Sequence, residues 1–166
     1  MNNSYQKEIC SIISSDVMIN ESLSKHTSFG IGGPVNCLIF PKNKEELSLI
    51  LKYTFKNQIP IKFIGSGSNI LVWDDGFDGV IISLKKTFKN LKFQNNSQII
   101  AESGVMLGTL VKNAMKNNIS GLESLIGVPG TLGGALIMNA GAFGGEISQF
   151  FTEAKTICFN GKIKIY

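Results

Sequence analysis

The chain has 166 residues, of which 43% are hydrophobic and 17% are charged. A chain of this length buries roughly 70% of its unfolded surface, so it can form a globular core, and the composition excludes a disordered chain. All 16 basic residues are lysines, and the net charge is +4. Because the lysines are scattered and arginine is absent, we expect no nucleic-acid binding.

Targeting and metal signals are also missing from the sequence. No apolar run reaches the ~18 residues of a membrane span, and residues 1–8 do not begin a secretory signal, so we expect a cytoplasmic protein without membrane contact. The three cysteines, Cys10, Cys37 and Cys158, and the single histidine, His26, lack the spacing of a metal site. We expect buried, reduced thiols, no metal, and a histidine that hydrogen-bonds locally.

Hydrophobic periodicity predicts helices and strands in the first half of the chain. In chain order they are a helix that carries Tyr5, Ile9, Ile12, Ile13 and Val17, a polar connector from Asn20 to Thr27, a strand at Val35–Phe40, a helix from Asn43 to about Asn57, and strands at Ile61–Ile64, Ile70–Trp73 and Val80–Ser83. Asn43 and Glu46 have the spacing of a capping box, and Phe55 is expected at the end of the buried stripe of the second helix.

The second half is predicted to contain two further helices among short strands. The elements are strands at Lys92–Gln94 and Gln98–Glu102, a helix that carries Leu107, Leu110, Val111, Ala114 and Met115, a short helix at Leu132–Met138, and strands at Thr156–Phe159 and Lys162–Tyr166. Asn160 and Gly161 between the last two strands indicate a hairpin. Because the alternating pattern still runs at Tyr166, we interpret the C-terminus as a truncated boundary.

A glycine-rich loop, Gly65–Asn69, follows the predicted strand Ile61–Ile64. It lacks the Walker pattern and fits a Rossmann fingerprint poorly, because a second strand rather than a helix is expected to follow. We interpret the loop as a nest of backbone N–H groups that binds a pyrophosphate, with side-chain help from Ser66, Ser68 and Asn69. The alternative is an ordinary turn. On the first interpretation, Gly67→Val should block phosphate binding without unfolding the protein.

A second, apolar stretch with many glycines runs from Gly121 to Gly145. Thr131 is predicted to cap the short helix, whose N-terminus would offer free N–H groups to a phosphate. Gly133 and Gly134 in its first turn would let a flat ring or a phosphate lie against the backbone. The alternative is close helix packing through small residues.

Five motifs occur together in one order along the chain: Lys25–Pro34 (KHTSFGIGGP), Gly65–Val72 (GSGSNILV), Gly121–Glu123 (GLE), Gly127–Ala135 (GVPGTLGGA) and Met138–Glu146 (MNAGAFGGE). With them the chain closely resembles the UDP-N-acetylenolpyruvoylglucosamine reductases, also called UDP-N-acetylmuramate dehydrogenases or the MurB family. The resemblance covers most of the chain.

The resemblance implies an α+β fold of the vanillyl-alcohol-oxidase or PCMH type, in which two lobes hold FAD between them. It implies an N-terminal helix and connector at 1–24 and an FAD-binding domain at 25–166, with lobe one at about 25–84 and lobe two at about 85–166. The residues implied to bind FAD are Gly65, Ser66, Gly67, Ser68 and Asn69 at the pyrophosphate, and Gly104, Gly127, Val128, Pro129, Gly130, Thr131, Gly133, Gly134, Asn139, Gly141, Ala142 and Gly144 around the flavin and the rest of the cofactor.

The resemblance also implies a reaction of peptidoglycan synthesis, and with it a role in cell shape and division. In this family NADPH reduces the flavin, which then passes hydride to the enolpyruvyl group of a UDP-sugar. The family's catalytic arginine, in a Tyr-Arg-x-Ser motif, and its serine and glutamate have no counterpart here, and Gly30 stands where many relatives have a basic residue. We therefore expect non-covalent FAD binding but no catalytic residue, and UDP-sugar binding only with a further C-terminal domain.

Two alternatives stay open at this point. The chain could be an FAD module of another oxidoreductase in the same superfamily, in which His26, Cys37 or Cys158 would be the candidates for covalent attachment. It could also be a non-enzymatic phosphate-binding module. An oxidised-flavin absorbance band would separate both flavin interpretations from this last one.

Overall fold

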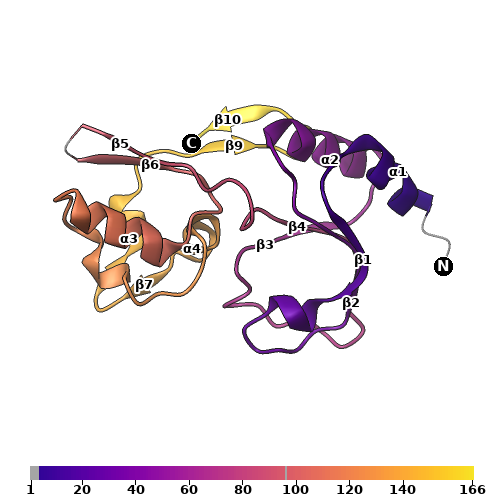
Figure 1. Ribbon diagram of the computed structural model, residues 1–166, viewed down its shortest axis with the longest axis horizontal. Coiled ribbons are helices and arrows are strands. Elements are labelled where there is room, and N and C mark those ends of the chain that lie inside the picture. Colours follow the sequence, from indigo (N-terminus) through magenta and orange to yellow (C-terminus); the bar gives the residue numbers. More distant parts are fainter. Residues whose placement is uncertain (1–3, 96) are drawn as a thin grey trace. The chain divides into compact units, whose positions relative to one another are not determined.

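The computed structural model describes residues 4–95 and 97–166. The chain forms two compact units, the first made of Met1–Ser83 and Glu153–Tyr166 and the second of Leu84–Thr152. Each unit combines helices with strands (Figure 1), in agreement with the predicted α+β class.

A four-stranded sheet forms the centre of the first unit, in the order β1-β2-β4-β3. Strands β2 (Pro34–Ile39), β4 (Phe77–Ser83) and β3 (Ile61–Ile64) run parallel, and β1 (Val17–Ser22) is an antiparallel edge strand. The last five residues of β4 are buried, because a central parallel strand is covered on both faces. The carboxyl ends of the three parallel strands therefore lie at one edge, where the loop 65–69 begins.

Two helices, α1 (Ser4–Ile12) and α2 (Lys44–Lys56), lie on one side of this sheet (Figure 1). Helix α2 begins where predicted: the Asn43 side chain accepts a hydrogen bond of 2.9 Å from the backbone N–H of Glu46. The Glu46 carboxylate accepts hydrogen bonds from the backbone N–H groups of Ser14, at 2.8 Å, and Lys42, at 3.0 Å. Glu46 thus joins the start of α2 to the segment that follows α1.

The other side of the sheet is covered by the short 3₁₀ helix η1 (Leu23–His26) and by loops. Leu23 is fully buried in a hydrophobic cluster with residues of β2, β3 and β4. Burial of a leucine of this kind stabilises the fold by about 1.5–3 kcal/mol. The cluster comprises Leu23, Val35, Leu38, Phe40, Ile64 and Ile81.

The predicted C-terminal hairpin is confirmed, with strands β9 (Lys155–Ile157) and β10 (Ile163–Ile165). The Cys158 N–H donates to the Lys162 carbonyl and the Gly161 N–H to the Cys158 carbonyl, both at 2.8 Å. These bonds enclose a three-residue loop in which Gly161 has φ +78°, the left-handed position that such loops require.

The second unit is built around helix α3, which the sequence predicted, and helix α4, which Thr131 caps as predicted. Its elements are β5 (Leu91–Gln94), β6 (Gln98–Ala101), α3 (Leu107–Lys116), η2 (Leu122–Leu125), α4 (Leu132–Met138), β7 (Gly141–Ala142), β8 (Gly145–Glu146) and η3 (Ile147–Phe150). The buried stripe of α3 packs against η2, α4 and η3 in one core: Val105, Leu107, Leu110, Val111, Ala114, Leu122, Leu125, Ala135 and Ile147.

Three predicted elements differ from the structure. Residues 70–73 form no strand, because the chain there bonds to the loop before β2: the Gly33 N–H donates to the Trp73 carbonyl at 2.9 Å. Val17, predicted on the first helix, instead begins β1, and the predicted connector Asn20–Thr27 contains the end of β1 and η1. Phe55 is 63% exposed, so the buried stripe of α2 ends at Thr54.

The two compact units also divide the chain differently from the predicted lobes. Residues 153–166, predicted in lobe two, cluster with the first unit, and the lobes at about 25–84 and about 85–166 stay predictions. The domain at 25–166 after an N-terminal segment at 1–24 stays a prediction. Within residues 4–95 and 97–166, no helix has the length and apolar character needed to cross a membrane.

Candidate cofactor site

The loop 65–69 leaves the carboxyl end of β3 in the first unit. The Ser83 hydroxyl at the end of β4 donates to the Gly65 carbonyl at 3.4 Å, and the Ser66 hydroxyl lies 3.3 Å from that of Ser68. Gly67 has φ +78°. The backbone therefore turns sharply at Gly67, as the sequence predicted for a nest.

Three amides of this loop are available to a ligand. In the parts of the chain that the structure describes, no group accepts a hydrogen bond from the backbone N–H of Ser66, Gly67 or Asn69. Unpaired N–H groups of a glycine turn at the carboxyl edge of parallel strands form an anion-binding concavity. The loop thus has the donors that a phosphate group needs, and it carries no cationic side chain.

Gly67 is required for a reason that the sequence did not show. A Cβ atom on Gly67 would lie 1.9 Å from the carbonyl oxygen of His26, and the Ser28 N–H donates to the Gly67 carbonyl at 2.9 Å. The loop therefore packs directly on the segment 26–28. The expectation that Gly67→Val would leave the fold intact is wrong, because the added side chain would collide with protein backbone.

In the second unit, Gly127–Thr131 precedes α4. The Val128 N–H donates to the Leu125 carbonyl at 3.1 Å, whereas none of the described residues accepts from the N–H groups of Gly127, Gly130 or Thr131. A Cβ atom on Gly127 would meet no atom within 4 Å. Backbone donors and open space at Gly127 make this segment the second candidate contact for a ligand.

The amides at the start of α4 are not free, contrary to the prediction. The Leu132 N–H donates to the Val105 carbonyl at 2.7 Å and the Gly133 N–H to the Ser103 carbonyl at 2.9 Å, and Gly134 donates to the Thr131 hydroxyl at 3.4 Å. A Cβ atom on Gly133 would lie 2.9 Å from that of Ser103. Close packing, the alternative interpretation, explains this glycine.

Gly104 directly follows Ser103, the residue against which Gly133 packs. Its N–H donates to the Phe88 carbonyl at 3.0 Å, and a Cβ atom would lie 2.1 Å from the Leu84 carbonyl oxygen. The structure therefore gives Gly104 a packing role, and its contact with a cofactor stays a prediction.

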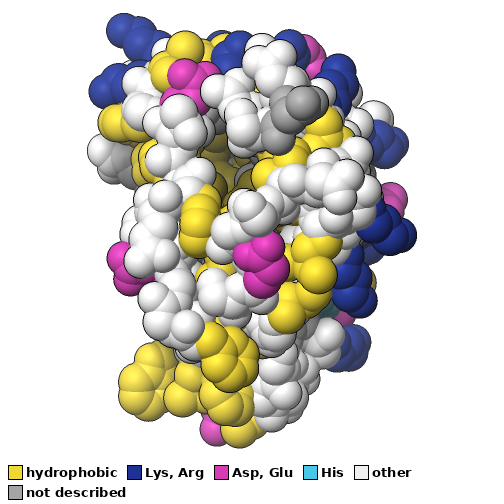
Figure 2. All heavy atoms as spheres, turned by 90° about the vertical axis from the view of Figure 1, so that its left-hand side faces the viewer, with side chains coloured by type: hydrophobic (Ala, Val, Ile, Leu, Met, Phe, Trp, Pro, Cys, Tyr) yellow, Lys and Arg dark blue, Asp and Glu magenta, His cyan; other side chains and the backbone are white. Residues whose placement is uncertain are grey.

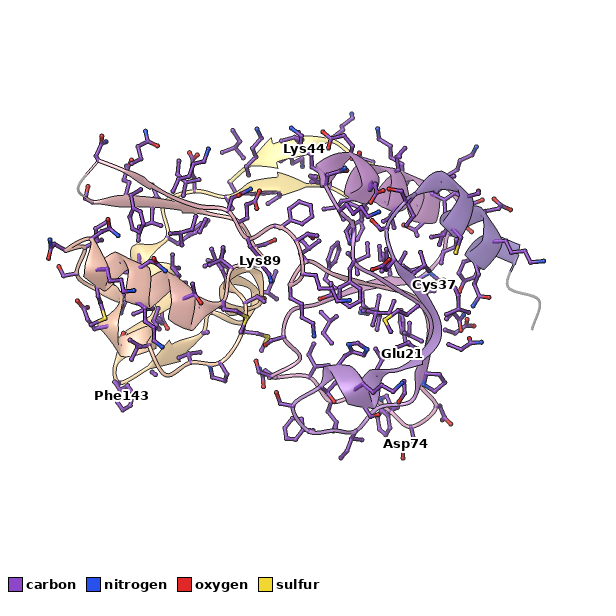
Figure 3. All side chains as sticks on the ribbon, viewed as in Figure 1. Glu21, Cys37, Lys44, Asp74, Lys89 and Phe143 are labelled. Carbon is purple, nitrogen blue, oxygen red and sulfur yellow. The ribbon has the colours of Figure 1, made fainter. Side chains whose placement is uncertain are left out.

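The segment 139–144 forms the end of α4 and a tight hairpin. Asn139 adopts the left-handed conformation and its Oδ1 accepts from the Ser148 N–H at 3.2 Å. Gly141 and Ala142 form β7, and the hairpin turns through Phe143, with φ +52°, and Gly144, with φ +81°. Phe143 is 91% exposed and projects from the hairpin tip (Figure 3). A bulky residue held in this conformation stores backbone strain, which is typical of functional positions.

Large apolar side chains follow both glycine-rich segments and are exposed. Leu71 and Trp73 follow the loop 65–69 in the first unit, at 71% and 84% exposure, and Ile137 at the end of α4 is 85% exposed. Figure 2 shows hydrophobic side chains, in yellow, exposed on the face that forms the left-hand side of Figure 1. Exposed groups of this size are typical of ligand or partner contacts.

The histidine and the three cysteines lie in different surroundings. His26 Nε2 lies 3.0 Å from Glu21 Oε1, so the histidine hydrogen-bonds locally, as predicted. Cys37 is buried, and burial raises the pKa of its thiol to about 12, with a smaller contribution from Cys10. Cys10 is exposed, which corrects the expectation that the thiols are buried. Among the described residues no three His, Cys, Asp or Glu side chains group as a metal site.

A family model with the description "FAD binding domain" matches residues 35–165. The chain belongs to this FAD-binding family. The match contains both the loop 65–69 and the segment 127–144, so the free amides described above lie inside the family's cofactor-binding domain.

The chain is also similar to curated relatives. It is 45% identical over 159 residues to the UDP-N-acetylenolpyruvoylglucosamine reductase of Carboxydothermus hydrogenoformans. The matched region covers 96% of this chain and 52% of the relative. It is 42% identical to the reductase of the same name from Clostridium tetani, over 97% of this chain and 53% of the relative. The chain thus spans about half the length of the curated relatives it matches.

Solved structures agree with the fold. The crystal structure of UDP-N-acetylenolpyruvylglucosamine reductase from Thermus caldophilus matches with a TM-score of 0.70 at 28% identity, over 93% of this chain and 52% of that one. Chitooligosaccharide oxidase matches with a TM-score of 0.72 at 16% identity, over 99% of this chain and 37% of that one. At this low identity the match shows the fold alone. The fold is the predicted PCMH-type FAD-binding fold.

Sequence reasoning missed the residues around the loop 65–69. The His26 carbonyl and the Ser28 N–H lie against Gly67, and Glu21 on β1 contacts the His26 side chain. The sequence signal that could have indicated this support is the spacing of Glu21 and His26, two residues that can hydrogen-bond to each other, within the polar stretch Asn20–Thr27.

Proposed function

We propose that this chain binds FAD non-covalently and forms the FAD-binding part of a UDP-N-acetylenolpyruvoylglucosamine reductase. The observation that carries the proposal is the set of unpaired amides at Ser66, Gly67 and Asn69 in a loop without cationic side chains. A diphosphate bridge carries two negative charges, and a hydrogen bond to a charged group contributes about 1.5–3 kcal/mol. Three such donors can therefore hold the bridge without a lysine.

The remaining contacts are assigned to the second unit. We assign the flavin and the rest of FAD to Gly127–Thr131 and to 139–144, where the N–H groups of Gly127, Gly130 and Thr131 have no acceptor in the described chain and Gly127 faces open space. When bound, FAD supplies the capacity to accept and donate hydride. The protein contributes orientation of the cofactor through backbone donors and apolar side chains.

The reductase activity requires residues that these 166 do not contain. The chain lacks arginine, so no guanidinium is present to stabilise negative charge that develops on a substrate. We propose that NADPH oxidation and binding of the UDP-sugar depend on a part equivalent to the remaining half of the relatives, which this chain does not match. The expected cytoplasmic location and role in cell-wall synthesis belong to the same proposal.

Non-covalent binding is supported by the state of two of the three candidate attachment residues, His26 and Cys37. The ring of His26 is engaged with Glu21, and Cys37 is buried in the sheet. Acid precipitation of the reconstituted protein should therefore release all flavin into the supernatant. Flavin that stays with the pellet would favour another oxidoreductase of the superfamily.

The proposal is tested by titration of the purified chain with FAD. We expect quenching of flavin fluorescence at a stoichiometry of one and an oxidised-flavin absorbance band that stays with the protein after gel filtration. With NADPH and the enolpyruvyl UDP-sugar, we expect no turnover above free FAD. Absence of FAD binding would overturn the proposal, and turnover by the chain alone would overturn the assignment of catalysis to a further part.

A further inference from the structure

The phosphate loop, defined here as residues 65–69, is held in place by the backbone of the segment 26–28. Gly67 contacts it twice: the Ser28 N–H donates to the Gly67 carbonyl at 2.9 Å, and the Cα of Gly67 faces the His26 carbonyl so closely that a Cβ atom would lie 1.9 Å from it. The orientation of the Gly67 peptide, and with it the direction of the neighbouring N–H groups, therefore depends on where residues 26–28 lie.

The side chain of His26 connects the segment 26–28 to the sheet, and the Thr27 hydroxyl holds the same segment through a hydrogen bond of 2.8 Å to the Ile31 carbonyl. His26 Nε2 lies 3.0 Å from Glu21 Oε1, and each of these two side chains is only 13% exposed. The imidazole ring also packs on Phe40, with ring centroids 6.3 Å apart and a tilt of 46°. Figure 3 shows Glu21 on β1 beside η1. Because β1 belongs to the four-stranded sheet, Glu21 is an anchor on the rigid part of the unit.

The pKa of Glu21 is lowered, as expected for a carboxylate that accepts a hydrogen bond from His26. The hydrogen bond from His26 is the main cause that lowers the pKa of Glu21, and burial opposes it. Lys25 also contacts this carboxylate, at 3.4 Å, but its side chain is 66% exposed. The buried contact of Glu21 is thus with His26, and Lys25 adds a screened surface pair of small energy.

We propose that His26, anchored by Glu21, is a positioning residue that sets the geometry of the phosphate loop and thereby the affinity for FAD. The proposal rests on the proposed FAD site, because it assigns the support of the same loop. The chain of contacts runs from Glu21 on β1 through the His26 side chain and the backbone of residues 26–28 to Gly67. None of these supporting side chains needs to touch the cofactor.

The test compares four variants for FAD affinity by fluorescence titration. His26→Ala and Glu21→Ala should each weaken FAD binding about tenfold, the loss that one charge-assisted hydrogen bond typically carries. His26→Gln should restore most of the affinity, because its amide N–H can reach the position of Nε2 and donate to Glu21. Lys25→Ala, the matched control, removes the exposed neighbour of Glu21 and should bind FAD as the unmodified chain does.

A readout on the apoprotein separates positioning of the loop from general damage. In ¹H–¹⁵N spectra without FAD, the amide signals of Ser66 and Gly67 should shift in His26→Ala and Glu21→Ala. They should stay in place in Lys25→Ala and return toward their original positions in His26→Gln. If His26→Ala does not fold, Glu21→Ala carries the same test with residues 26–28 unchanged.

The outcomes distinguish this inference from the proposed function. Unchanged affinity and unchanged loop amides in both alanine variants would overturn the role of His26 while FAD binding by the unmodified chain stands. Failure of the unmodified chain to bind FAD would overturn the proposed function and with it the effect on affinity, and the loop amides would still decide whether the pair holds the loop. Equal loss in His26→Gln and His26→Ala would contradict positioning through the bond to Glu21.

Discussion

At the scale of single residues, the glycines of the two glycine-rich segments divide into two groups. Gly67, Gly104 and Gly133 are required because a side chain would collide with neighbouring atoms of the protein itself. Gly127 and Gly144 face open space. A glycine count in the sequence cannot separate packing from ligand contact, because the colliding atoms come from residues distant in the chain.

The first prediction concerns Gly67 and Gly127. Gly67→Ala should destabilise the protein by at least about 2 kcal/mol, because the new Cβ atom meets the His26 carbonyl and φ is +78°. Gly127→Ala should leave stability within about 0.5 kcal/mol of the original but weaken FAD binding. Urea unfolding of the apoproteins and FAD titration of both variants check this. Equal stability of the two variants would contradict the packing role of Gly67.

At the scale of elements, sequence patterns correctly predicted the helices, caps and turns whose interactions lie within a few residues of one another. The apolar stripe of α3, the caps at Asn43 and Thr131, and the hairpin at Gly161 are confirmed because their interactions span few residues. Strand β1 was missed because its consecutive polar residues Asn20, Glu21 and Ser22 interrupt the apolar pattern that predicts a strand, so its second half resembles a loop in sequence.

The same argument explains the two errors at the candidate site. The continuous apolar run of residues 70–73 is typical of a strand, but the chain there bonds to Gly33 instead of a strand partner. The first amides of α4 are paired with Ser103 and Val105, about 30 residues earlier in the chain. Contacts of this sequence separation leave no periodic signal, so the free amides could only be identified from the structure.

The second prediction concerns Glu46, which links α2 to residues 14–15. Burial raises the pKa of this carboxyl, but hydrogen bonds from Ser15, Lys42 and Ser14 outweigh burial and lower it to about 2 from an ordinary value of 4.5. The folded state therefore binds this proton less readily than the unfolded state. Its contribution to stability is complete above pH 4.5 and is lost as the pH falls toward 2.

Urea unfolding between pH 7 and pH 2.5 measures this effect. Glu46→Gln should cost about 1.5–3 kcal/mol at pH 7 and should show a smaller loss of stability on acidification than the original chain. Glu45→Gln, at the exposed neighbouring position, is the control and should keep the original pH dependence. A Glu46→Gln variant with the unmodified pH profile would show that other carboxyl groups dominate acid unfolding.

At the scale of the whole molecule, the candidate FAD contacts are distributed over both compact units. Residues 65–69 belong to the first unit, and the segments 127–131 and 139–144 belong to the second. A ligand that binds only the folded state stabilises it, by about 2.7 kcal/mol at a concentration a hundred times Kd. FAD binding should therefore stabilise the protein as a whole.

The third prediction concerns the effect of FAD on thermal unfolding. FAD at a hundredfold excess over Kd should raise Tm by about 5–10 °C in a chain of this size. Riboflavin, which lacks the diphosphate bridge, should raise it less, since the phosphate loop has nothing to bind. Differential scanning calorimetry with both ligands checks the prediction, and equal shifts would show that the loop does not contribute.

The hairpin β9–β10 clusters with the first unit although it follows the second unit in the sequence. The second unit is therefore an insertion, and both of its ends connect to the same body. During synthesis on the ribosome, residues 4–83 emerge first but must wait for some seventy more residues before their last two strands are made. Early nascent chains of the first unit would consequently expose the part of α2 near Lys52, which Gly161 of this hairpin meets once the hairpin has been made.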